Sequence, residues 1–148
     1  MNPPAPPALP PELTAVLHRL RLPYMRRAAP EVLAVARAQR WDPAEVLRVL
    51  LAEEAAGRDA ATTAMRRRAA GFPAGKTLAS WRETESAIPL PTQHALATLE
   101  WLGRAENLVL AGPSGTGKTH WLEGHAGAAI DAGRRVAWFS LESLTATM

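Results

Sequence analysis

One loop constrains this chain more than any other feature, and it reads Gly112, Pro113, Ser114, Gly115, Thr116, Gly117, Lys118 and Thr119. The loop fits the phosphate-binding pattern G-x-x-x-x-G-K-[ST], which joins a buried strand to a following helix. The apolar run at 107–111 is typical of such a strand. Residues 119–132 predict the helix, and Gly133 is its stop signal.

The residue types in the loop suit phosphate chemistry. Glycines at 112, 115 and 117 let main-chain N–H groups approach phosphate oxygens closely. The start of the following helix adds unsatisfied N–H donors and a partial positive charge. Lys118 is expected to reach the β- and γ-phosphates of a nucleotide, and the hydroxyl of Thr119 is a candidate Mg²⁺ ligand. The alternative is an ordinary glycine-rich turn.

Hydrolysis needs more than this loop. Phosphoryl transfer also requires a second acidic group near Mg²⁺ and a group that orients the attacking water. The segment 134–140 predicts a second strand, but no acid ends it, and a short helix is expected to begin at Leu141. Glu123 and Glu142 are expected to be solvated. The sequence therefore predicts nucleotide binding and assigns no catalytic residue.

Composition narrows the class of protein. The chain has 148 residues, a net charge of +3 and no cysteine, so disulfides and thiolate metal sites are excluded. The mild basic charge is compatible with nucleic-acid contact. No apolar run is long enough to span a membrane, and no signal peptide is recognised, so a cytoplasmic protein is expected.

The chain divides into four predicted parts. Residues 1–11 hold many prolines and predict a disordered arm, with an SH3-type ligand as the alternative. Residues 12–70 predict a small helical domain, 71–91 a linker, and 92–148 a partial nucleotide-binding domain. The fold class predicted is therefore α/β, with a helical N-terminal domain followed by the truncated start of a P-loop parallel sheet.

Several helix signals lie within these parts. Asp42 and Pro43 are typical of an N-cap and a first helical position. Pro30 is expected to split or kink the second helix. A further helix is predicted at 92–102. The four histidines are expected to be structural or solvated, and Trp81 to anchor the linker by packing, with stacking on a base as the alternative.

A basic run near the end of the helical domain has two interpretations. Arg66, Arg67 and Arg68 are either a solvated helix end, where cations favour the helix dipole, or a contact to DNA phosphates. Composition and spacing leave both open.

Several motifs together carry a resemblance to a known family. They are Leu20-Arg21-Leu22-Pro23-Tyr24-Met25, Phe72-Pro73-Ala74-Gly75-Lys76-Thr77-Leu78, Leu99-Glu100-Trp101-Leu102, Glu106-Asn107-Leu108-Val109-Leu110, and the loop 112–119 with His120. In this order the chain resembles the IstB-like ATP-binding proteins, helper ATPases of insertion-sequence transposition, over about residues 13–145. The resemblance implies an AAA+ ATPase related to DnaC-type helicase loaders, with ATP and Mg²⁺ as cofactors.

The resemblance also implies partners: DNA, a transposase, and a homo-oligomer where the ATPase domain is complete. In this family the Mg²⁺-side acid follows further along the chain, so the expectation is a truncated copy with its phosphate loop intact. Trp121 and the segment 79–86 depart from the family pattern. A fragment of a replicative helicase loader and a non-enzymatic DNA- or partner-binding remnant are the alternatives.

Overall fold

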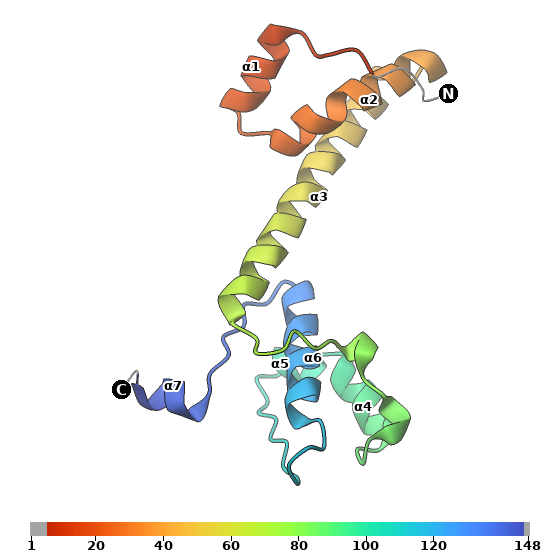
Figure 1. The fold of residues 1–148 in the computed structure, drawn as a ribbon. Coiled ribbons are helices and arrows are strands. Elements are labelled where there is room, and N and C mark those ends of the chain that lie inside the picture. Colours follow the sequence, from red (N-terminus) through yellow and green to blue (C-terminus); the bar gives the residue numbers. More distant parts are fainter. Residues whose placement is uncertain (1–5, 147–148) are drawn as a thin grey trace, which may run out of the picture. The chain divides into compact units, whose positions relative to one another are not determined.

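The computed structural model describes residues 6–146 (Figure 1). The chain divides into two compact units, and the boundary between them falls within one long helix. The N-terminal unit extends to Thr62 and the C-terminal unit begins at Thr63. Helices α1 (Pro11–Arg19), α2 (Pro23–Gln39) and the first part of α3 (Pro43–Ala70) make up the N-terminal unit. The first five residues of the predicted proline-rich arm lie outside the described part of the chain.

Proline starts each of these three helices. Pro11, Pro23 and Pro43 stand at first helical positions, where the fixed φ of proline suits the helix and its missing N–H costs nothing. The predicted cap of α3 is confirmed, since Asp42 Oδ1 accepts a hydrogen bond of 2.8 Å from the N–H of Ala44. Of the two effects predicted for Pro30, a split or a kink, the split does not occur, because α2 continues through Pro30.

A buried carboxylate from α3 completes the start of α2. Glu54 is only 4% exposed and accepts 2.9 Å hydrogen bonds from the N–H groups of Tyr24 and Met25. Burial alone would raise the pKa of Glu54, but these hydrogen bonds and the guanidinium of Arg58 lower it below its ordinary value. The carboxylate thus satisfies N–H groups that a helix leaves without partners in its first turn.

The C-terminal unit consists of short elements around one central helix. Two 3₁₀ turns, η1 (Leu78–Ser80) and η2 (Glu83–Glu85), precede α4 (Leu90–Ala97) and α5 (Glu100–Gly103). Helix α6 (Lys118–Asp131) follows, and α7 (Leu141–Ala146) closes the described chain. The single helix predicted at 92–102 is wrong, because Leu99 takes a left-handed conformation (φ 61°) between α4 and α5. The predicted stop of α6 is confirmed at Gly133 (φ 82°).

The predicted α/β fold with a parallel sheet is contradicted. Within residues 6–146 there is no strand, and the runs at 107–111 and 134–140 are extended but form no ladder. A strand exists only where a neighbouring strand accepts and donates its backbone hydrogen bonds. Val109 is 86% exposed, and the N–H of Trp138 donates to the carbonyl of Ala70 at 3.1 Å instead. An apolar run alone therefore did not make a sheet here.

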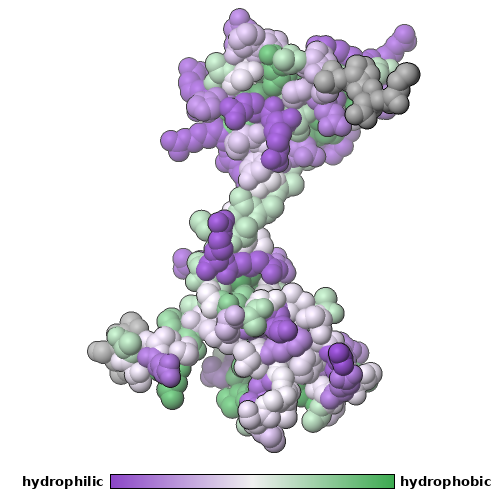
Figure 2. Space-filling view, viewed as in Figure 1, coloured by the Kyte–Doolittle hydropathy of each residue, from purple (hydrophilic) through white to green (hydrophobic). Residues whose placement is uncertain are grey.

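Apolar side chains also remain on the surface of the C-terminal unit. Leu141 is 80% exposed and Leu144 is 48% exposed, and Figure 2 shows this apolar surface over α7. The core of the unit is formed by Trp121, Ala129 and Ile130 of α6 together with Ala70. Of the helices that the structure describes, none has the length and apolar character to cross a membrane.

Candidate functional site

The predicted phosphate loop, Gly112–Thr119, runs from the extended segment 107–111 directly into α6. Gly115 (φ 79°) and Gly117 (φ 81°) take the left-handed conformation that favours glycine. Gly117 is the N-cap of α6 and Lys118 is its first residue. The loop therefore places unsatisfied N–H groups and the positive end of the α6 dipole at one point.

The loop is closed by contacts within itself. Thr116 Oγ1 donates a 2.9 Å hydrogen bond to the carbonyl oxygen of Pro113, and the ammonium group of Lys118 donates to the same oxygen. Ser114 and Thr119 are exposed, and Thr119 lies in the first turn of α6. Six of the eight predicted loop residues line one cavity, and Ser114 and Thr119 are not among the residues that line it.

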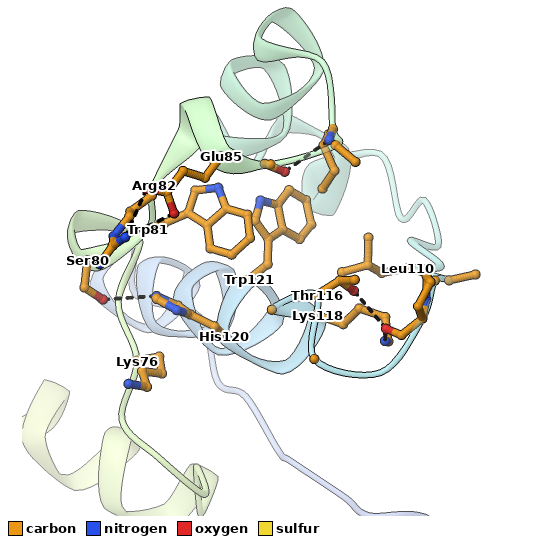
Figure 3. A pocket seen from close by; sticks show the side chains of 18 residues that line it. Lys76, Ser80, Trp81, Arg82, Glu85, Leu110, Thr116, Lys118, His120 and Trp121 are labelled. Atoms are coloured by element: carbon orange, nitrogen blue, oxygen red, sulfur yellow. Dashed lines mark hydrogen bonds and ion pairs between the residues drawn. The ribbon is translucent and has the colours of Figure 1, made fainter.

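A cavity of about 680 Å³ opens beside this loop (Figure 3). Its volume lies within the range of small-molecule sites, about 300–1,000 Å³. One side is the phosphate loop, and the other side is made by residues 76–88 of the predicted linker together with His120 and Trp121. We call it the loop cavity. The sequence prediction found the loop side and missed the linker side.

The charges around the loop cavity favour an anion. Lys76, Arg82 and Lys118 line it, against the single carboxylate of Glu85. Arg82 donates a 3.0 Å hydrogen bond to Glu85, so these two opposite charges form a pair within the linker. Within residues 6–146 no cluster of histidine, cysteine and acidic side chains could hold a metal ion by itself.

Helix α6 holds the linker in place through Glu123. This side chain is fully buried, and its carboxylate accepts hydrogen bonds from the N–H groups of Ala74 (3.0 Å) and Lys76 (2.8 Å). The prediction that Glu123 is solvated is therefore wrong. Two glycines inside α6, Gly124 and Gly127, suggest close approach of another segment, and of the two only Gly124 has a neighbour within 4 Å of an added Cβ.

Two further contacts hold the linker on the same helix. The Nε2 atom of His120 lies 3.0 Å from Ser80 Oγ and 3.2 Å from the carbonyl oxygen of Thr77. Leu78 packs against Gly124, where an added Cβ would lie 2.9 Å from its Cδ2 atom. His120 is therefore structural, as predicted. The helix that begins at the phosphate loop also carries the opposite wall of the cavity.

His125 is buried on another face of α6. Its Nδ1 lies 2.9 Å from the carbonyl oxygen of Trp121, while its Nε2 is buried with no partner among the described residues. Burial lowers the pKa of His125, although the Trp121 carbonyl partly opposes this. Burial therefore favours the neutral form of the imidazole, which belongs to the core. An apolar cavity of about 280 Å³ lies beside it.

The arginine run contacts the far end of α6. Arg67 forms a salt bridge of 2.6 Å with Asp131, and Arg66 donates to the carbonyl oxygen of Gly133 at 2.8 Å. Arg68 is exposed near the end of α3. Two of the three predicted DNA-contacting residues thus have partners within the protein, and only Arg68 keeps an outward position.

A glycine-rich loop opens a helix beside a cavity that is lined by more basic than acidic side chains, which is the arrangement typical of phosphate-binding loop proteins. The family comparison then narrows the class. The chain belongs to the IstB-like ATP binding protein family, whose model matches residues 15–148.

Individual relatives agree with this family. The chain is 33% identical over 138 residues to an insertion sequence IS21 ATP-binding protein of Pseudomonas aeruginosa, covering 93% of this chain and 52% of that protein. It is 32% identical to an IS21-like ATP-binding protein of Bacteroides fragilis (strain YCH46), covering 90% and 67%. A Mycobacterium tuberculosis insertion-sequence protein is 34% identical, covering 74% and 44%. The chain spans about half the length of most of these relatives.

Proposed function

We propose that this chain binds ATP at the loop Gly112–Thr119. The observation that carries the proposal is the conformation of Gly117, which caps α6 at φ 81° and places Lys118 at the first helical position beside the loop cavity. Backbone N–H groups at a helix start are ready donors to phosphate oxygens. When ATP binds, the ammonium group of Lys118 leaves the carbonyl oxygen of Pro113 and donates to the β- and γ-phosphates instead.

Mg²⁺ is part of the same proposal, as a companion of the phosphates. Thr119 offers one exposed hydroxyl oxygen on the first turn of α6, next to Lys118. Mg²⁺ prefers oxygen ligands and usually keeps several waters, with substrate phosphates and one or two protein groups completing its shell. A single hydroxyl is thus a sufficient protein contribution for binding.

The wider role we propose is that of a helper in insertion-sequence transposition, acting with DNA and a transposase. The support is the family membership and the names of the relatives, which are insertion-sequence ATP-binding proteins. Arg68 is the residue of the basic run best placed for a DNA phosphate, because it is exposed while Arg66 and Arg67 bind α6. Assembly into an ATP-dependent homo-oligomer is part of the same proposal.

Titration with fluorescent ATP in the presence of Mg²⁺ tests nucleotide binding. We expect saturable binding by the wild type and a loss of about tenfold or more in Lys118→Ala, since a charge-assisted contact is worth about 1.5–3 kcal/mol. Arg40→Ala, on the N-terminal unit, is the matched control and should bind as the wild type does. Equal binding by Lys118→Ala and the wild type would refute the assignment of the loop.

A further inference from the structure

The loop cavity has two chemically different sides. The loop side offers backbone N–H groups and the ammonium of Lys118. The linker side presents the apolar surface of Trp81, Ala87 and Ile88, next to Lys76, two serines and the paired Arg82 and Glu85. Phosphates require the first side, because an anion needs donors and positive charge. A ligand that also fills the second side must carry an apolar, flat or polarisable group. A nucleoside has such a group, and a bare polyphosphate does not.

Trp81 stands where these two sides meet. A Cβ added to Gly117 would lie 2.8 Å from Cζ3 and 3.2 Å from Cη2 of the indole, so its six-membered ring lies against the N-cap of α6. His120 supports the indole in an edge-to-face arrangement, with ring centroids 5.3 Å apart. The indole is therefore next to the point at which the phosphate-binding donors of the helix begin.

A buried amide fixes the indole in this position. Gln93 of α4 is 3% exposed, and its Oε1 accepts a 2.7 Å hydrogen bond from Trp81 Nε1. Its Nε2 donates to the carbonyl oxygens of Ile88 (2.6 Å) and Glu83 (3.1 Å). The partners define the orientation of the amide, because flipping it would point NH₂ at the indole N–H and oxygen at two carbonyls. Both polar atoms of the Gln93 side chain thus hold the linker and the indole in place.

From this geometry we propose that Trp81 contacts the nucleoside part of the bound nucleotide, and that Gln93 is its positioning residue. The inference rests on the proposed function, since it assigns the second half of the same site. Its consequence is selection of a nucleoside triphosphate over inorganic polyphosphate. Stacking on an aromatic ring does not distinguish between bases, because every base has a π-face. Trp81 therefore selects for the presence of a base and leaves its identity open.

Competitive titration of the full chain with two probes, Mg-ATP and Mg-tripolyphosphate, tests the inference. We expect the wild type to bind ATP about tenfold more tightly than tripolyphosphate. Trp81→Leu should remove most of that preference by weakening ATP alone. Trp81→Phe keeps an aromatic ring and should keep most of it. Trp41→Leu, on the N-terminal unit, is the control of the same residue type and should behave as the wild type.

Gln93→Met tests the positioning role. It keeps the length of the side chain without its hydrogen bonds, so the ATP preference should fall while tripolyphosphate binding stays. A purely structural role would weaken both probes in parallel, and that result in Gln93→Met or Trp81→Leu would overturn the inference. Equal affinity of the wild type for both probes would also overturn it and leave the proposed function standing. Failure of the wild type to bind either probe would overturn both proposals.

Discussion

The ring of Tyr24 on α2 lies directly against the backbone of Gly57 on α3. A Cβ added to Gly57 would lie 2.2 Å from the Cγ atom of Tyr24, which is too close for two atoms that are not bonded to each other. The absence of a side chain at position 57 therefore allows these two helices of the N-terminal unit to approach. Glu54, one turn earlier on α3, binds the first-turn N–H groups of α2 beside the same contact.

Gly57→Ala should destabilise the N-terminal unit. The substitution gains up to about 1 kcal/mol of helix propensity, but overpacking costs about 1–3 kcal/mol, so the net effect is a loss. Thermal unfolding followed by circular dichroism should show a lower melting temperature. Adding Tyr24→Leu should restore part of the loss, because the smaller side chain makes room. A melting temperature equal to or above that of the wild type would show that the contact is not tight.

Alanine substitutions at two glycines one turn apart on α6 should have different effects. Gly127 has no atom within 4 Å of an added Cβ, so Gly127→Ala should stabilise the C-terminal unit by about 1 kcal/mol through helix propensity. Gly124 faces Leu78 at 2.9 Å, so Gly124→Ala should displace the linker and weaken ATP binding. Urea unfolding and ATP titration of both variants measure these effects. Weakened ATP binding in Gly127→Ala alone would contradict the proposed linker contact.

Lowering the pH should reduce the stability of the N-terminal unit, because Glu54 becomes protonated. The pKa of Glu54 is lower in the folded chain than its ordinary value of 4.5, so the unfolded state binds a proton first as pH falls. The stabilisation is fully present above pH 4.5 and is lost as pH falls through the lowered folded pKa. Melting temperatures from about pH 7 to about pH 3 should fall more steeply in the wild type than in Glu54→Gln. Parallel curves would contradict the role of this carboxylate.

Amide hydrogen exchange should separate the extended runs from α6. The N–H groups of Leu108, Val109 and Leu110 belong to no ladder and should exchange fast, while those in the middle of α6 should be protected. Exchange measured by NMR or mass spectrometry checks this. Strong protection at 108–110 in the monomer would mean that these residues pair in solution.

ATP binding by these residues should occur without turnover. Of the acids in α6, Glu123 is held by the linker N–H groups, and Asp131 pairs with Arg67 at the opposite end of the helix. Glu85, the carboxylate that lines the loop cavity, pairs with Arg82. Phosphoryl transfer needs an acidic group free to serve beside Mg²⁺, and each of these three carboxylates is already engaged. Phosphate release should therefore equal that of Lys118→Ala. Release that depends on Lys118 would refute this expectation.

Two local signals were read correctly from the sequence, the stop of α6 at Gly133 and the cap at Asp42, and each depends on residues within a few positions. Other local signals were misread, since the helix predicted at 92–102 is divided at Leu99. The sheet was predicted wrongly because a strand depends on a partner that an apolar run does not specify. The linker side of the loop cavity was missed because Glu123 contacts Ala74, which is 49 positions away in the sequence, and no periodic pattern connects the two residues. The glycines inside α6 were the indication in the sequence, and Gly124 marks the contact while Gly127 does not.

The contacts of Glu123 have a practical consequence for dissecting the protein. A fragment that starts at Thr92 would keep every residue of Gly112–Thr119 and would pass any motif search for a nucleotide site. It would nevertheless lack Lys76 and Trp81, and the carboxylate of Glu123 would lose both of its donors. The smallest unit worth expressing for nucleotide work therefore begins before Ala74, well upstream of the recognisable motif.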